Sequence, residues 1–237
     1  MIFIICFFTI FTAMECNCEL CDLKNIFFAT IEPSELEEFC ASRIEITIAP
    51  KDIVIKQGDP IHDFVYLKEG LVKLYRETDA GNQIISIGKP FDFVSLLSVF
   101  GEEKYQYSVS AITDSVICVM KLQDIQKLIL ENGAFALRLI KTMNKATDRI
   151  LFDYLDNSQK RLYGRVAHVL IDFSEIFNNE TFDLPISRKE IAQLVGMSIE
   201  NVIRTISELR KDKIINVFGK SIVILDMHRL KQIRSNN

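Results

Sequence analysis

Residues 187–210, with the sequence SRKEIAQLVGMSIENVIRTISELR, constrain the fold of this chain more than any other segment. Ser187 and Glu190 have the spacing of a capping box, which predicts that a helix begins there. Gly196 predicts the end of that helix, because a residue without a Cβ atom tolerates the left-handed backbone of a tight turn. Ser198 can then cap a second helix. Two helices joined by so short a turn predict a helix-turn-helix.

The second helix carries side chains suited to reading base pairs. Arg204 can donate two hydrogen bonds to guanine, and Glu200 can accept one from cytosine. Ile203 can touch a thymine methyl group but cannot form a hydrogen bond. The alternative interpretation is a surface ion pair on an ordinary helical hairpin. The predicted DNA-contacting set of this motif is Arg188, Ser198, Glu200, Asn201, Ile203 and Arg204.

The sequence after the helices predicts a wing. Residues 214–218 and 221–225 read as two short strands around the turn Gly219-Lys220. A hairpin directly after a recognition helix is typical of a winged helix, and Lys220 at its tip suits a phosphate contact.

The charge distribution agrees with this placement. The chain has 28 Lys and Arg against 32 Asp and Glu, a net charge of −4. Residues 157–237 contain 13 basic and 9 acidic residues, a balance of +4, whereas residues 1–156 contain 15 and 23, a balance of −8. The positive end is therefore the end expected to meet DNA phosphates.

Residues 1–13, MIFIICFFTIFTA, form an apolar and uncharged leader. A bilayer span needs about 20 residues, so the leader is too short to cross a membrane. It also lacks the positive start of a signal peptide. We expect translation to begin at Met14, with a membrane-associating tail as the alternative. The expected location is the cytoplasm, with no membrane partner.

Residues 44–122 predict a compact antiparallel β-roll. Short strand-like segments alternate with turn residues such as Gly58-Asp59, Glu69-Gly70 and Gly88. The segments are IEITIAP, KDIVIKQGD, FVYLKEG, LVKLYRETDAGN, QIISIG, FDFVSLL, YQYSVSAI and SVICVMKL. A short helix over 32–41 precedes them.

A long helix is predicted over residues 134–154. Its apolar side follows heptad spacing, which indicates a helix pair, although burial against its own domain is the alternative. The predicted dimer seam is Ala136, Ile140, Met143, Thr147, Ile150 and Tyr154. Asp156-Asn157-Ser158 predicts a break, with a further helix running to about Phe177.

The chain thus divides into five parts. We expect an apolar leader (1–13), a cysteine-containing tail (14–31), a sensor β-roll (32–125), a dimerisation region (126–156) and a winged helix-turn-helix domain (157–237). The fold class is α+β, with a cupin-like jelly roll at the N-terminal side.

This order of parts resembles the Crp/Fnr family of bacterial transcription regulators. The segments that carry the resemblance are GDPIHDFVYLKEGLVKLY and SRKEIAQLVGMSIENVIRTISELRKDKII, and it extends over roughly residues 28–230. The resemblance implies a homodimer on a near-palindromic site, with recognition helices about 34 Å apart in successive major grooves. It also implies RNA polymerase as a partner, and a signal sensed in the roll that reorients the DNA-binding domains.

The resemblance offers two kinds of signal. Members that bind cyclic AMP use a Glu and an Arg, where this chain has Leu96 and Tyr105, so that ligand is not expected in the usual manner. Members that sense oxygen hold a [4Fe–4S] cluster on cysteines. The matching candidates here are Cys16, Cys18, Cys21 and Cys118, although C-x-C-x-x-C is a tighter spacing than in that branch. Zinc binding, a thiol switch, and no cysteine function beyond burial are the alternatives.

Two other classes of function compete with DNA binding. A signalling subunit could bind a nucleotide or a protein with its roll and use the winged helix for protein contacts. An enzyme is not expected, because the sequence has no nucleophile–base pairing, Gly-rich phosphate loop or paired-carboxylate motif.

Overall fold

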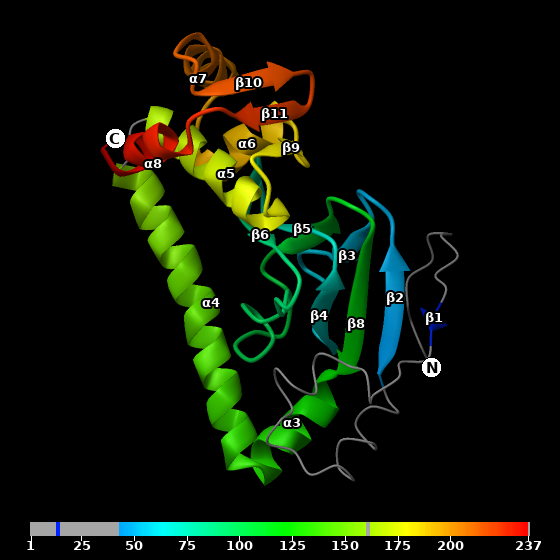
Figure 1. The fold of residues 1–237 in the computed structure, drawn as a ribbon. Coiled ribbons are helices and arrows are strands. Elements are labelled where there is room, and N and C mark those ends of the chain that lie inside the picture. Colours follow the sequence, from blue (N-terminus) through cyan, green and yellow to red (C-terminus); the bar gives the residue numbers. More distant parts are fainter. Residues whose placement is uncertain (1–12, 15–42, 160–161, 237) are drawn as a thin grey trace.

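The computed structural model describes residues 13–14, 43–159 and 162–236, and it confirms the predicted fold class. A β-roll lies beside a long helix, and a second, smaller domain lies at the far end of that helix (Figure 1). The helix predicted over 32–41 lies outside the described residues. Within the described part of the chain, no helix is long and apolar enough to cross a membrane.

The roll consists of two four-stranded antiparallel sheets with orders β1-β2-β8-β4 and β3-β7-β5-β6. The first sheet contains β1 (Ala13–Met14), β2 (Ile44–Ile48), β4 (Asp63–Glu69) and β8 (Ser115–Lys121). The second contains β3 (Ile53–Ile55), β5 (Val72–Thr78), β6 (Gly81–Gly88) and β7 (Ser108–Ala111). Apolar side chains of both sheets meet in one core that includes Phe64, Leu67 and Val109, each with an exposed fraction of 0%.

The turn between β4 and β5 requires glycine. Gly70 has a φ of 87°, and a Cβ atom there would lie 2.2 Å from Ser115 Oγ and 2.5 Å from the carbonyl oxygen of Asp114. The strand-end turn can therefore pack tightly against the start of β8 only without a side chain.

The segment FDFVSLL (91–97) is not a strand, which corrects the sequence prediction. It does contact β4, because Val94 donates its N–H to the carbonyl of Val65 at 3.0 Å. Phe91, however, has a left-handed φ of 77°, and the N–H of Val99 bonds back to the carbonyl of Ser95. A left-handed residue and a closed turn both interrupt an extended strand, whereas a short apolar run looks the same in either state.

Helix α3 (Leu122–Glu131) follows the roll and leads into α4 (Gly133–Gln159). Phe135 and Leu139 of α4 have exposed fractions of 0% and 2% and pack in the core of the roll. The helix runs through residues 156–158, so the predicted break there is wrong. Asp, Asn and Ser each cost a helix interior well under about 1 kcal/mol relative to Ala, which is too little to end a helix. The next helix, α5 (Leu162–Phe177), begins four residues after Ser158.

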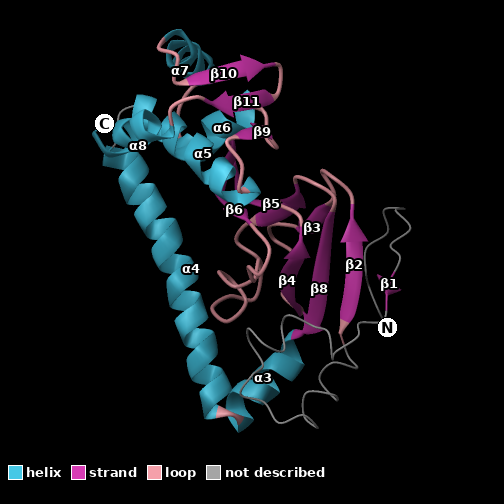
Figure 2. Ribbon diagram, in the orientation of Figure 1, coloured by secondary structure: helices cyan, strands magenta, loops and turns pink. Residues whose placement is uncertain are grey.

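The C-terminal domain is built from helices around a small sheet (Figure 2). Its helices are α5, α6 (Arg188–Val195), α7 (Ile199–Lys211) and α8 (Met227–Asn236). Its sheet has the order β10-β11-β9, with β9 (Thr181–Asp183), β10 (Ile215–Phe218) and β11 (Ser221–Ile224). Val166, Ile191, Val202 and Leu209 share its core, with exposed fractions of 0%.

Candidate nucleic-acid interface

Local sequence signals set the geometry of α6 and α7 as predicted. The Ser187 hydroxyl accepts a hydrogen bond from the N–H of Glu190, and the Glu190 carboxylate accepts one from the N–H of Ser187 at 2.8 Å. Gly196 ends α6 with φ 65° and ψ 48°. Ser198 caps α7 by accepting from the N–H of Asn201 at 3.3 Å. These caps satisfy backbone groups at the ends of the two helices, which lie on either side of a short turn.

Helix α7 buries one side and exposes the other. Val202, Ile206 and Leu209 pack in the domain core. The exposed fractions are 51% for Ile203 and 64% for the Arg204 side chain. This exposed side carries the residues that were predicted to read bases.

Arg204 is held by polar neighbours on its own helix. Its Nη2 donates to Asn201 Oδ1 at 2.9 Å, and its Nε lies 4.0 Å from a carboxylate oxygen of Glu208. Contacts between such exposed groups contribute only about 0–1 kcal/mol, so the guanidinium can exchange them for a base edge. Asn201 is thus both a hydrogen-bond partner of Arg204 and a candidate DNA contact.

Glu200 lies in the first turn of α7 and is fully exposed. Hydrogen bonds from its own backbone N–H and from the Ser198 side chain lower its pKa. The carboxylate is therefore ionised at neutral pH and acts as a hydrogen-bond acceptor, as contact with a cytosine amine requires.

The predicted wing forms next to this helix. β10 and β11 pair antiparallel in the register Phe218↔Ser221, and Gly219 in the turn has a φ of 63°. Lys220 is exposed at the tip. Arg188 of α6 donates to the carbonyl of Gly219 at 3.4 Å, and burial lowers the pKa of its guanidinium. Arg188 thus connects α6 to the wing turn.

Phe218 was missed by the sequence prediction. It precedes the wing turn and is 67% exposed, although aromatic side chains are usually buried. The wing therefore carries an exposed aromatic side chain directly before Gly219 and Lys220. The signal was its position next to Gly219-Lys220, not its residue type.

The structure separates the predicted dimer seam into two groups. Ile140 and Tyr154 are 53% and 66% exposed, and Thr147 is exposed as well. Met143 packs against the core of the roll, and Ile150 lines a pocket between α4 and the roll. The partly buried Ala136 precedes them on α4.

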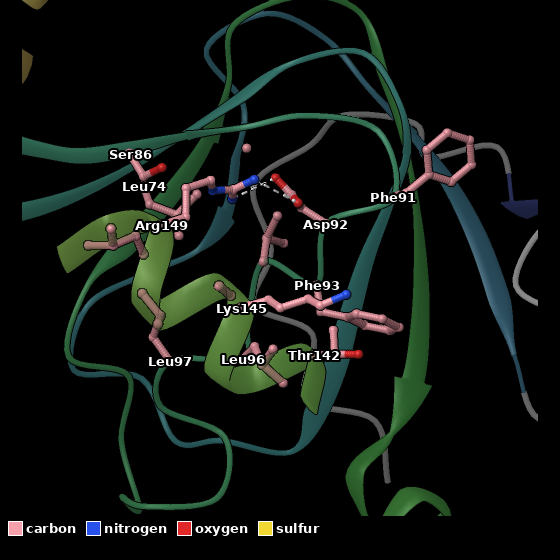
Figure 3. A pocket seen from close by; sticks show the side chains of 14 residues that line it. Leu74, Ser86, Phe91, Asp92, Phe93, Leu96, Leu97, Thr142, Lys145 and Arg149 are labelled. Atoms are coloured by element: carbon pink, nitrogen blue, oxygen red, sulfur yellow. Dashed lines mark hydrogen bonds and ion pairs between the residues drawn. The ribbon is translucent and has the colours of Figure 1, made fainter. Parts of the chain in front are cut away.

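Figure 3 shows the side chains that line this pocket. Its volume is about 150 Å³. Arg149 of α4 approaches it but forms a two-pronged ion pair with Asp92 at 3.0 and 3.2 Å. Leu96 lies in the pocket wall, and Tyr105 is buried in the core, donating its hydroxyl to the carbonyl of Asp63 at 2.9 Å. An anion in this pocket would meet the Arg149 guanidinium, which is already paired with the Asp92 carboxylate. That this roll does not take cyclic AMP in the usual manner stays a prediction.

Cys118 is the one candidate cysteine that lies among the described residues. Cys16, Cys18 and Cys21 lie outside the described residues. Cys118 is 1% exposed in β8, opposite Glu45 of β2 and Tyr66 of β4. Among the described residues, no group of three or more His, Cys, Asp or Glu side chains is arranged to hold a metal ion. The iron–sulfur assignment therefore stays a prediction.

The fold and the exposed face of α7 define a DNA-binding transcription regulator of the winged-helix class. Two family models match the chain: a Crp-like helix-turn-helix domain over residues 164–233 and a cyclic nucleotide-binding domain over residues 45–132. The chain belongs to the Crp/Fnr family of transcription regulators.

Relatives and solved structures agree with this placement. The chain is 26% identical over 181 residues to the transcriptional activator protein Anr of Pseudomonas aeruginosa, covering 74% of each protein. It is 26% identical over 188 residues to the transcriptional activator protein FnrL of Cereibacter sphaeroides, covering 75% of each. FixK2 from Bradyrhizobium japonicum has a similar fold, with a TM-score of 0.71 and 21% identity over 81% of this chain and 96% of that chain. The alternative of a signalling subunit is not favoured.

Proposed function

We propose that this protein is a homodimer that recognises a near-palindromic DNA site with one α7 helix in each half-site. The observation that carries the proposal is the exposed α7 face, where a guanidinium and a carboxylate lie one helical turn apart beside Ile203. Arg204 would donate to guanine N7 and O6, and Glu200 would accept from a cytosine N4 amine. Lys220 and Arg188 would contact phosphates, which position the domain without reading sequence.

Ile203 predicts a preference for one base pair in each half-site. Its 51% exposed side chain lies between Glu200 and Arg204 in sequence and has no polar atom. An apolar side chain in the major groove is favoured next to the methyl group of thymine. We infer that the base pair beside the one read by Arg204 is a T·A pair.

Selection of duplexes from a random pool with the full-length protein tests this assignment. The selected site should contain inverted repeats with centres about one helical turn, or 34 Å, apart. Arg204→Ala should weaken binding to the selected site by about 1–3 kcal/mol and relax the preference at one base pair in each half-site.

Arg210→Ala provides the matched control. Arg210 is exposed in the last turn of the same helix, far from the end that enters the groove. Loss of the Arg210 side chain should weaken binding to selected and unselected duplexes equally, and by less than Arg204→Ala weakens binding to the selected site. If Arg204→Ala and Arg210→Ala have equal and sequence-independent effects, α7 does not read the bases.

The proposed dimer contact lies on the exposed side of α4, which keeps Ile140, Thr147 and Tyr154 of the predicted seam but not Met143 and Ile150. Exposed residues follow heptad spacing along this side, with successive offsets of three and four. The members are Leu137, Ile140, Asn144, Thr147, Leu151 and Tyr154. Heptad spacing over more than two repeats is suited to a coiled coil with a second copy of α4.

Sedimentation velocity tests the dimer. Leu151→Glu places a charge in the proposed seam and should produce monomers at micromolar concentration. Leu130→Glu is the control, because Leu130 on α3 is 86% exposed and lies outside the seam. A dimer that survives Leu151→Glu would show that α4 does not pair along this side.

The cysteine hypothesis has a separate test. Anaerobic purification followed by a visible spectrum and iron and sulfide analysis should show a broad absorbance that air removes if Cys16, Cys18, Cys21 and Cys118 hold a [4Fe–4S] cluster. A colourless, iron-free protein would remove the hypothesis. RNA polymerase is the expected partner of the DNA-bound dimer, and the cytoplasm the expected location.

A further inference from the structure

The sensor roll contacts the helix-turn-helix directly, at a place separate from α4. Strand β6 packs against α6, and Figure 1 shows the ends of β5 and β6 beside the C-terminal domain. Ile87 of β6 and Ile112, which follows β7, are partly buried against the core of the DNA-binding domain. The two domains therefore share an apolar contact.

An ion pair lies beside this apolar contact. Lys73 Nζ of β5 lies 2.5 Å from Glu190 Oε1 of α6, and the two side chains are only 23% and 24% exposed. Lys73 and Ile87 are cross-strand partners in the β5–β6 register, so one pair of residues presents both an ammonium group and an apolar surface to α6.

Glu190 has two functions in this arrangement. Its Oε1 accepts from Lys73, while its Oε2 accepts from the N–H and the hydroxyl of Ser187, both at 2.8 Å. Burial alone would raise the pKa of Glu190, but the hydrogen bonds from Lys73 and Ser187 outweigh it and lower the pKa. The carboxylate that caps the first helix of the DNA-binding motif is thus the group that the roll holds.

The contact leaves the reading face open. Ile203 and Arg204 remain 51% and 64% exposed, and Lys220 is exposed at the wing tip. α7 and the β10–β11 hairpin lie on the side of the domain away from the roll (Figure 1). The contact therefore does not block DNA binding by covering α7. Its physical effect is to limit the orientations of α6, and hence of α7.

We propose that Lys73 and Ile87 are positioning residues for DNA recognition, which hold each DNA-binding domain in the orientation that lets both recognition helices of a dimer meet successive major grooves. This inference rests on the proposed function. When the orientation is fixed before binding, no free energy has to be spent on orienting the two domains for the two half-sites. Binding to a single half-site carries no such cost, because one domain can meet the duplex in any orientation.

The difference between the two kinds of DNA provides the test. Affinities of the full-length protein are measured for the selected duplex with two half-sites and for a duplex in which one half-site is scrambled. Lys73→Met should weaken binding to two half-sites by about fivefold or more and leave single half-site binding within about twofold. Ile87→Ala should do the same without any change of charge.

Two further variants separate positioning from other effects. Lys73→Arg keeps a cation within reach of Glu190 and should restore affinity for two half-sites. Lys104→Met removes an exposed positive charge from the same roll, at a residue that pairs with Pro60, and should change neither affinity. Unchanged single half-site binding also shows that the DNA-binding domain of each variant is folded.

Each outcome has a distinct meaning. If the unaltered protein binds two half-sites no better than one, the proposed function fails. If it prefers two half-sites but Lys73→Met and Ile87→Ala keep that preference in full, the positioning inference is wrong. It is also wrong if Lys104→Met weakens binding as much as Lys73→Met.

Discussion

The turn between α6 and α7 allows a stability change to be worked out from the structure. Gly196 has a φ of 65°, and a Cβ atom there would have no heavy atom within 4 Å. The cost of Gly196→Ala is therefore a backbone cost alone, about 1–2 kcal/mol for an L-residue in the left-handed region. The reduced entropy of the unfolded chain offsets about 0.4–1 kcal/mol. We expect a net loss of about 1 kcal/mol.

Gly196→Asn is the matched variant, because Asn adopts the left-handed conformation more readily than Ala. Urea unfolding of the full-length protein, followed by circular dichroism, should place the Asn variant between Ala and the parent. A loss above about 3 kcal/mol for Ala would mean that the side chain clashes. Equal losses for Ala and Asn would mean that φ at this position does not determine stability.

Three further changes test other parts of the structure. Gly70→Ala should destabilise the roll far more than Gly196→Ala destabilises the C-terminal domain, because its Cβ would lie 2.5 Å from a backbone oxygen; thermal unfolding measures both. Ser187→Ala removes the α6 cap and should cost about 1 kcal/mol in the same assay. Burial raises the pKa of Asp172 to about 6 from its ordinary 3.8. The protonated carboxyl group stabilises the folded state fully below pH 3.8, and this contribution is lost as pH rises through 6. Asn does not titrate, so Asp172→Asn should gain stability relative to the parent between about pH 4 and pH 7. A constant difference over that range would refute this assignment.

The parts that the sequence predicted well depend on neighbouring residues. The capping box of Ser187 and Glu190, the left-handed Gly196 and the Ser198 cap each act within four residues along the chain. Such signals need no knowledge of the tertiary fold. The wing hairpin around Gly219 was predictable for the same reason.

The parts that the sequence did not predict depend on tertiary contacts. Residues 91–97 have the apolar pattern of a strand, but Phe91 adopts a positive φ while the next residues bond to β4. The break predicted at residues 156–158 is a separate case, because Asp, Asn and Ser disfavour a helix too weakly to end α4 there. The Lys73–Glu190 pair joins residues 117 positions apart, and nothing in either local sequence indicates the other.

In the proposed coiled coil of two α4 helices, the exposed Asn144 would have a consequence for subunit exchange. At the two-fold axis of a coiled coil, an amide can satisfy a second copy of itself, while a leucine or valine opposite it would leave its polar atoms without a partner. A cell that contains several regulators of this architecture would then assemble few mixed pairs from this chain. Asn144 would weaken the α4 dimer contact, but by disfavouring mixed dimers it would keep each regulator on its own operators.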